Sequence, residues 1–260
     1  MKPSQIAAQL YTVRDHCATA SGLAASLAKL RAIGYRAVQV SGLGPIPDAE
    51  IGAILAGEGL VCCATHEPSA TILDSPHLVV ERLRRLNCRF TAYPYPRDID
   101  FSNEEHIRTL VRKLDAAGAV LRAAGLVLGY HNHAIEFVSH RGRPVLEHLF
   151  AATDPRHLVA ELDTYWVHYG GGDVVAWCER LAGRLPFIHL KDYGFSLENK
   201  PEFREIGRGN LDWSRIIPAA EKAGCEWFIV EQDTCAGDPF ESLRLSYDYL
   251  CENFAGGRCP

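Results

Sequence analysis

The sequence has no C-x-x-C pair, although nine of its 260 residues are cysteines. The number is odd, the residues are scattered, and Cys62 and Cys63 are adjacent. Neither a zinc ribbon nor a thioredoxin-type motif is therefore present. We expect the cysteines to be mainly small core residues in a reducing compartment.

The chain also lacks Lys/Arg-rich runs and long apolar segments. A net charge of -5 and a pI near 6.1 give no broad basic field, so nucleic acid is not an expected partner. No segment approaches the roughly 18 consecutive apolar residues of a membrane span. The first eleven residues contain one lysine and too short an apolar stretch for a signal peptide. We expect a cytoplasmic protein that does not bind membranes.

Short apolar runs alternate with longer helical patterns along the whole chain. The predicted strands are residues 6–10, 37–40, 60–65, 89–93, 125–130, 157–162, 185–188 and 227–230. The predicted helices are residues 22–33, 48–56, 76–86, 103–124, 144–151, 173–181, 213–223 and 239–253, with Ser102 as the cap of the fourth. Because βαβ crossovers are right-handed, eight such units predict a single (β/α)8 TIM barrel over residues 1–260, an α/β fold with its active site at the carboxyl ends of the strands.

Three predicted strands of the second half end in metal-binding side chains. Asp163, His189 and Glu231 directly follow strands 157–162, 185–188 and 227–230. Side chains at the carboxyl ends of successive barrel strands converge in space. One aspartate, one histidine and one glutamate form a mixed N/O set suited to a divalent metal, Mn²⁺, Zn²⁺, Co²⁺ or Mg²⁺.

Each of these residues also has a simpler structural interpretation. Asp163 precedes Thr164 and could cap a turn or helix, and His189 alone could be a satisfied core histidine. Glu231 follows four apolar residues, where a carboxylate is costly to bury without compensation. Alternation along the strand places Glu161 on the same side as Asp163, but only Asp163 lies at the strand end. The joint occurrence of the three favours the metal site.

The fifth strand leaves the fourth ligand open. It is followed by His131, His133 and Glu136. We choose Glu136 as the metal ligand, because another carboxylate balances a divalent charge better than a neutral imidazole. His131 and His133 then become candidates for substrate hydrogen bonding or proton transfer, or one of them orients Glu136.

Polar side chains after other strands are candidates for substrate binding. His66 follows the third strand, Trp166 lies just after the sixth, and Lys191 lies after the seventh, where it is also a catalytic candidate. Arg208 stands between two glycines that allow close backbone approach to a ligand, and it could clamp an anionic or hydroxyl group. The alternative is a surface arginine.

Five motifs together resemble the xylose-isomerase-like TIM barrels known as sugar phosphate isomerases/epimerases. They are Gln9–Asp15, Tyr130–His133 with Glu136-Phe137, Leu162–Trp166, His189–Asp192 and Gly207–Gly209. The resemblance implies a divalent metal held by Glu, Asp, His and Glu from strands five to eight, with a keto-sugar bound through adjacent oxygens. The epimerases usually have a glutamate within strand five, where this chain has His131 or His133.

The expected function is therefore a metal-dependent sugar isomerase or epimerase. Metal chelation acidifies the C–H next to the carbonyl, Glu231 takes the proton, and an enediolate results. If His133 or His131 returns the proton to carbon, the product is an isomer or epimer. If it protonates a departing hydroxyl, the enzyme is a dehydratase or hydratase of the inosose or 3-keto-sugar type. A hydrolase of the apurinic-endonuclease branch and a non-catalytic sugar-binding barrel are the alternatives of other classes, and homo-oligomers are common among such barrels.

Overall fold

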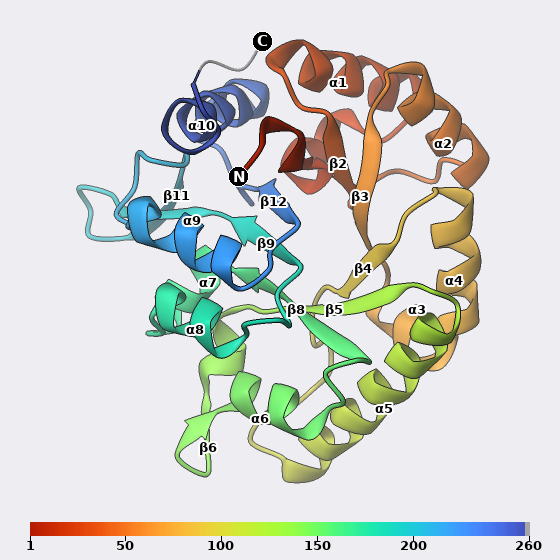
Figure 1. Ribbon diagram of the computed structural model, residues 1–260, viewed down its shortest axis with the longest axis vertical. Coiled ribbons are helices and arrows are strands. Elements are labelled where there is room, and N and C mark those ends of the chain that lie inside the picture. The colour runs from red at the N-terminus through yellow and green to blue at the C-terminus, as the bar shows by residue number, and fades with distance from the viewer. Residues whose placement is uncertain (258–260) are drawn as a thin grey trace.

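In the computed structural model, which describes residues 1–257, eight parallel strands close into a barrel surrounded by helices (Figure 1). The barrel strands are β1 (Ile6–Gln9), β2 (Ala37–Val40), β3 (Val61–His66), β4 (Phe90–Tyr93), β5 (Val127–His131), β8 (Leu158–Asp163), β9 (Phe187–Leu190) and β12 (Trp227–Val230). Strand β1 pairs with both β2 and β12, which closes the barrel. The predicted fold is confirmed, and each strand boundary lies within two residues of its prediction. The last three residues of the predicted domain lie outside the described residues.

The helices include all eight that the sequence predicted. They are α1 (Ala20–Ile33), α2 (Asp48–Gly57), α4 (Pro76–Arg85), α5 (Glu104–Ala123), α6 (Val145–Ala152), α8 (Val174–Arg180), α9 (Trp213–Lys222) and α10 (Pro239–Phe254). One predicted cap was wrong. The N-cap of α5 is Asn103 and not Ser102, because the Asn103 side chain accepts hydrogen bonds from Glu105 N and His106 N. Within residues 1–257 no helix is long and apolar enough to cross a membrane.

Several short elements were not predicted. They are the helices α3 (Ser69–Asp74) and α7 (Thr164–Tyr169), the 3₁₀ turns η1 (Pro3–Gln5), η2 (Leu10–His16) and η3 (Ala134–Phe137), the hairpin β6 (Ser139–His140) with β7 (Arg143–Pro144), and the hairpin β10 (Asp192–Phe195) with β11 (Pro201–Arg204). Most of them lie in the loops that follow barrel strands. These loops shape the active-site end of a TIM barrel.

The inside of the barrel changes from apolar to polar along the strands. A cluster of small and apolar side chains fills one layer: Ala7, Ala37, Cys63, Ala64, Phe90, Ala92, Phe187 and Ile229. Side chains two positions further along a strand point the same way. The next layer toward the carboxyl ends is therefore polar and buried, and includes Gln9, Gln39, His131, Glu161, His189 and Glu231. This second layer carries the candidate site.

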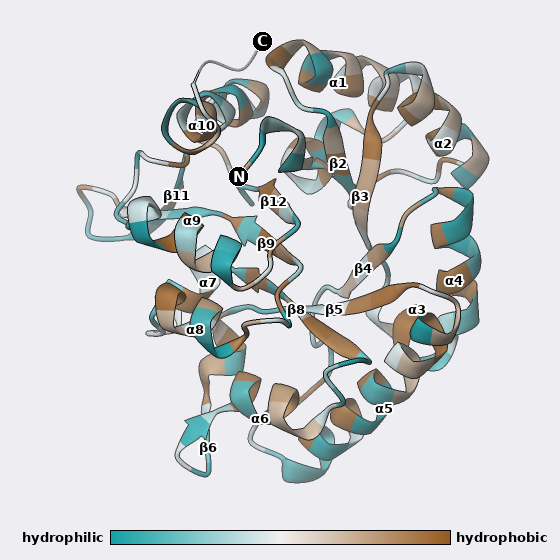
Figure 2. Ribbon diagram, viewed as in Figure 1, coloured by the Kyte–Doolittle hydropathy of each residue, from teal (hydrophilic) through white to brown (hydrophobic). Residues whose placement is uncertain are grey.

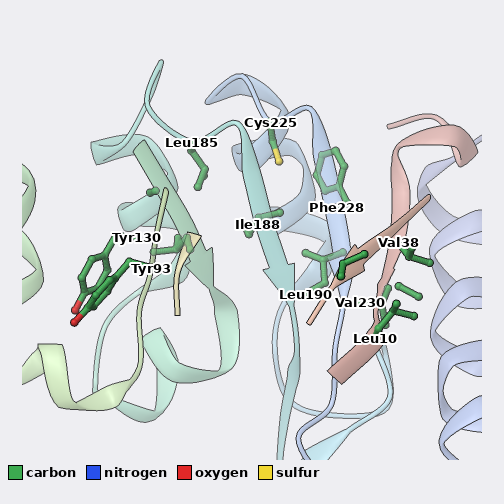
Figure 3. Close-up of a cluster of buried hydrophobic side chains, with 14 of the residues drawn as sticks. Leu10, Val38, Tyr93, Tyr130, Leu185, Ile188, Leu190, Cys225, Phe228 and Val230 are labelled. Atoms are coloured by element: carbon green, nitrogen blue, oxygen red, sulfur yellow. The ribbon is translucent and has the colours of Figure 1, made fainter. Parts of the chain in front are cut away.

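Side chains of the opposite parity pack outward against the helices. Ile188 and Leu190 on β9 lie beside Phe228 and Val230 on β12 in the strand register, and all four are buried in the main core (Figure 3). Burying such a side chain stabilises the fold by about 1.5–3 kcal/mol. Strands β3 and β5 are brown along much of their length in Figure 2, whereas the surrounding helices carry both colours. Apolar side chains thus pack on both the outer and the inner face of the barrel wall.

Seven cysteines of the described chain are free, and six of these are buried. Two of the buried ones, Cys62 and Cys63, belong to the outer and the inner core respectively. Cys251 is different, because it is disulfide-bonded. The prediction of small core cysteines therefore holds for most of them.

Replacing Gly118 by alanine should destabilise the fold, although alanine is normally favoured over glycine within a helix by up to about 1 kcal/mol. A Cβ on Gly118 of α5 would lie 2.1 Å from the carbonyl oxygen of His157, so backbone has to move. We expect Gly118→Ala to lower the free energy of unfolding by about 1–3 kcal/mol in urea titrations. Gly52→Ala in α2 is the control, because its Cβ would meet no atom closer than 3.5 Å. Equal stabilisation by both variants would contradict the packing argument.

Candidate metal centre

Four side chains converge at the carboxyl end of the barrel. One ligand atom from each of His131, Asp163, His189 and Glu231 lies within 4.8 Å of the other three, and all four residues are buried. They come from the ends of β5, β8 and β9 and from the position after β12. The predicted trio of Asp163, His189 and Glu231 is brought together, with His131 beside it.

The imidazoles of His131 and His189 lie between carboxylates on two sides. Asp163 and Glu231 are on the upper side, toward the carboxyl ends of the strands, and Glu161 is on the lower side. On the upper side, His189 Nδ1 is 2.9 Å from Glu231 Oε2, and His131 Nε2 is 3.8 Å from Asp163 Oδ2. On the lower side, His131 Nδ1 and His189 Nε2 each lie 3.3 Å from an oxygen of Glu161. His189 Nε2 is also 2.6 Å from Gln39 Oε1, its hydrogen-bond partner, whereas His131 Nδ1 has only the charge contact with Glu161. Groups behind a ligating histidine orient its ring. The arrangement directs one nitrogen of each ring toward Asp163 and Glu231.

Glu161 is fully buried beneath this group. Its oxygens lie 2.6 Å from Gln39 Nε2, which donates to it, and 2.5 Å from His66 Nε2. Burial alone would raise the pKa of the Glu161 carboxyl, but His189 and His66 outweigh it and hold the pKa well below its usual range. Glu161 is therefore a buried anion. The sequence showed that it shares the inward parity of Asp163, but gave no reason to select it.

Lys191 supplies positive charge to the same end of the barrel. Its Nζ lies 2.7 Å from Glu231 Oε2, 3.0 Å from Asp163 Oδ2 and 3.2 Å from Asp233 Oδ1. Burial acts to lower the pKa of Lys191, but these three carboxylates outweigh it and raise the pKa well above the usual value. Lys191 is therefore an ammonium that holds the carboxylates together. Asp233, two residues after Glu231 and of the same parity, was not among the predicted site residues.

The donor set fits a divalent metal ion. Two imidazole nitrogens and two carboxylate oxygens suit Mn²⁺, Zn²⁺, Co²⁺ or Mg²⁺ to different degrees. Asp163 Oδ1 caps α7 by accepting a hydrogen bond from Trp166 N, while the buried Asp163 Oδ2 makes no hydrogen bond and has the ion pair with Lys191 as its polar contact. Asp163 is thus both a helix cap and a group of the candidate metal centre. These residues could hold a metal ion.

A second group of potential ligands lies deeper. It consists of His66, His131, Glu161 and His189. Its carboxylate is already engaged by Gln39 and His66. The group also shares both histidines with the first one, so the two cannot be filled independently. The upper group with Asp163 and Glu231 is the better candidate.

The structure places Glu136 outside both groups. Its two oxygens accept hydrogen bonds from Tyr130 Oη and His133 N, each at 2.8 Å. The 3₁₀ turn η3 causes this, because it turns the side chain back toward the strand it follows. Burial raises the pKa of the Glu136 carboxyl to about 7. The position of the fourth candidate ligand, which the sequence argument assigned to Glu136, is taken by His131.

His133 borders the site without joining either group. Its ring packs against Tyr95, His131 and Trp166, and Nδ1 is buried without a hydrogen-bond partner. Burial, with His131 as the next cause, lowers the pKa of His133 to about 2. Burial likewise lowers the pKa of His131 to about 3, reinforced by His189. Both imidazoles are therefore neutral at pH 7.

A cavity of about 710 Å³ opens above the site, within the usual range of small-molecule sites, about 300–1,000 Å³. His66, His131, His133 and Glu231 belong to its walls. Three predicted contact residues are not among the lining residues: Trp166, Lys191 and Arg208. Of these, Lys191 stands behind Glu231, whereas Arg208 is exposed.

The Gly-Arg-Gly loop encloses a side chain of the protein itself. Gly207 N and Gly209 N donate to Asp192 Oδ2 at 2.9 and 3.1 Å, and Trp213 Nε1 donates to the same oxygen at 2.7 Å. Leu211 N donates to Oδ1 at 3.2 Å. The close backbone approach that the glycines predicted is real, but the anion approached is the buried Asp192 carboxylate.

Asp192→Asn should strongly destabilise the protein. The amide keeps the size of the carboxylate but turns a donor toward N–H groups that need an acceptor, so buried donors lose their partners. We expect a loss of about 2–5 kcal/mol in the free energy of unfolding by urea titration. The control is Asp15→Asn, an exposed position. A variant of Asp192 as stable as this control would contradict the anchoring role.

Comparison with known proteins agrees with this architecture. Among solved structures, a sugar phosphate isomerase/epimerase from Parabacteroides distasonis superposes with a TM-score of 0.82 at 20% identity, covering 98% of this chain and 96% of that one. A xylose isomerase-like TIM barrel protein from Mycobacterium smegmatis in complex with magnesium gives 0.74 at 13% identity, covering 98% of both chains. At these identities the likeness shows the fold.

A curated relative is the inosose dehydratase of Geobacillus thermodenitrificans. It is 26% identical over 166 residues, which are 57% of this chain and 55% of the relative. The chain thus spans about half the length of the curated relatives it matches. The model of the family described as xylose isomerase-like TIM barrel matches residues 27–251. The chain therefore belongs to the xylose isomerase-like TIM barrel family.

Proposed function

We propose that this protein is a divalent-metal-dependent enzyme that removes the proton next to the carbonyl of a keto-sugar or related polyol, and that it acts as a sugar isomerase or epimerase. The observation that carries the proposal is the ring of His131, Asp163, His189 and Glu231 at the cavity. These four residues would hold the ion. A Mycobacterium smegmatis protein of the same fold was solved in complex with magnesium, which supports the proposal of a metal-dependent barrel.

A bound divalent ion would polarise the substrate carbonyl and thereby acidify the neighbouring C–H. Glu231 is the residue placed to take that proton, because it lines the cavity. Burial acts to raise the pKa of Glu231, but Lys191 and His189 outweigh it and keep the pKa well below its usual range. Glu231 is therefore deprotonated at neutral pH. Lys191, 2.7 Å away, holds it in place.

The neutral state of His133 favours a one-base reaction. His133, the candidate for the second proton carrier, has a pKa lowered to about 2 and is neutral at pH 7. A neutral imidazole does not readily deliver a proton to carbon. The proton taken by Glu231 would then return from the same face, which suits isomerisation between neighbouring carbons better than two-base epimerisation.

Dehydration is the second candidate outcome. It begins with the same proton abstraction by Glu231 and ends with loss of a hydroxyl from the neighbouring carbon. The inosose dehydratase of Geobacillus thermodenitrificans, 26% identical over 166 residues, favours it. A multi-metal hydrolase is less well supported, because the two ligand groups found among residues 1–257 share His131 and His189.

Deuterium exchange tests the proposed function. The Mn²⁺-loaded protein, incubated in D₂O with keto-sugars and inososes, should incorporate deuterium next to the carbonyl, as measured by NMR. Glu231→Gln should reduce the exchange rate at least about 100-fold, because the base is lost. Glu136→Gln is a matched control, since Glu136 lies outside both ligand groups. No exchange with any substrate would contradict the proposal, and the products distinguish isomerisation from dehydration.

Metal titration tests the fourth ligand. His131→Ala should weaken Mn²⁺ binding by about 10-fold or more, because it removes a donor atom. Glu136→Gln should leave the affinity nearly unchanged, because both Glu136 oxygens are used by Tyr130 and His133. Isothermal calorimetry measures both. The opposite ranking would return the ligand role to Glu136.

Metal affinity should rise with pH. Burial lowers the pKa of His189, but Glu161 and Glu231 outweigh it and raise the pKa to about 10, so the free protein holds this proton at pH 7. An ion at Nδ1 must displace it, which predicts about a tenfold gain in affinity per pH unit between pH 7 and 9. Burial raises the pKa of Asp163 to about 6, so the dependence steepens below pH 6. Calorimetry in two buffers of different ionisation enthalpy counts the protons, and an affinity independent of pH would contradict the assignment.

A further inference from the structure

The walls of the cavity carry more negative than positive charge. Among the described residues that line it, Glu67, Glu231 and Asp233 are acidic, and Arg82 is the one lysine or arginine; Lys191, outside the lining, is already paired with Glu231 and Asp233. A phosphate ester brings about two further negative charges into this space. Carboxylates close to a bound anion oppose its binding, so phosphate would need a free cation in the wall.

Arg82 is not free to act as that cation. Its Nε donates to Glu67 Oε1 at 3.0 Å, and its Nη1 pairs with Asp48 Oδ1. Glu67 is only 5% exposed. A phosphate that took the guanidinium would leave Glu67 buried without its partner, which is strongly unfavourable. The charge of Arg82 is therefore already used.

The phosphate position common in TIM barrels is also filled. Phosphate groups in this fold are often bound by the loops after the seventh and eighth strands and by a helix N-terminus. Here β9 is the seventh strand, and the loop that leads from it to α9 binds the Asp192 carboxylate through Gly207 N, Gly209 N and Trp213 Nε1. A Cβ on Gly209 would lie 2.4 Å from Asp192 Oδ1, which shows how tightly the loop encloses it. An internal anion occupies these donors.

One imidazole in the wall, that of His133, can bind a hydroxyl group. His66 has Nδ1 3.5 Å from Ser41 Oγ and Nε2 2.5 Å from Glu161, so both of its nitrogens are engaged. His133 Nδ1 is buried without a partner and can exchange one hydrogen bond with a hydroxyl. We propose that the substrate bound here is an uncharged keto-sugar or polyol that carries no phosphate. This inference rests on the proposed function, since it names the substrate class of the same site.

Binding of a matched pair of probes tests it. Fructose and fructose 6-phosphate are titrated by calorimetry into the Mn²⁺-loaded protein, and again with a chelator present, so that contacts to the ion are separated from contacts to the wall. We expect the ester to bind no more tightly than the free sugar. The double variant Asp48→Asn/Glu67→Gln frees Arg82, and it should gain affinity for the ester by about tenfold or more.

The control is Asp74→Asn/Glu105→Gln, which removes two exposed carboxylates that pair with Lys113 and Arg112. It changes the net charge equally but leaves the Arg82 pairs intact. Tenfold tighter binding of the ester by the wild type would overturn the inference, and so would a double variant that gains no more than this control. If the wild type binds neither probe, the affinity of the double variant for the ester, compared with that of the control variant, decides whether the inference stands.

Failure of the proposed function would show separately. It would appear as the absence of deuterium exchange with every keto-sugar, whatever the binding preference. Exchange that occurs with phosphorylated sugars and not with the free sugars would overturn this inference and leave the proposed function standing.

Discussion

The pairing of the buried Glu161 carboxylate with the histidines above it is the interaction on which the site depends. A buried carboxylate without partners costs several kcal/mol, and Glu161 avoids this through Gln39, His66, His131 and His189. Its position at the lower nitrogens directs the upper nitrogens of His131 and His189 toward Asp163 and Glu231. The same residue thus explains why a polar layer can lie on the apolar floor of the barrel, and why the four candidate ligands face one another.

Charge balance is the second constraint on this end of the barrel. Asp163, Glu231 and Asp233 are acidic and lie around one ammonium, Lys191, and Glu161 adds a further buried carboxylate beneath the histidines. A divalent ion that took the place of the His189 proton would lower the remaining negative charge by one unit, because two positive charges would be added and one lost. Lys191 and His189 give Glu231 its low pKa, while the excess of carboxylates makes the cavity unfavourable for anionic ligands. The proposed metal ion, base and substrate class therefore all depend on one arrangement of charges.

The barrel and three of its candidate ligands could be predicted from the sequence because both follow from strand patterns. Apolar runs located the boundaries of the eight strands to within two residues. The position at the end of a strand identified Asp163, His189 and Glu231 as candidate ligands. Two side chains lie elsewhere than the sequence argument expected, because a turn, rather than a strand, sets the local geometry. Glu136 is turned back to Tyr130 by η3, and the loop around Arg208 closes on Asp192. Such long-range contacts leave no local pattern.

Anomalous diffraction at the manganese edge, from crystals grown with Mn²⁺, tests the central claim most directly. The account predicts one strong peak bounded by His131 Nε2, Asp163 Oδ2, His189 Nδ1 and a Glu231 oxygen, with Glu161 behind the two rings. Metal–ligand distances near 2.0–2.2 Å would identify the donor atoms. A peak coordinated by Glu136, a peak in the deeper group around Glu161, or no peak at full Mn²⁺ loading would contradict it.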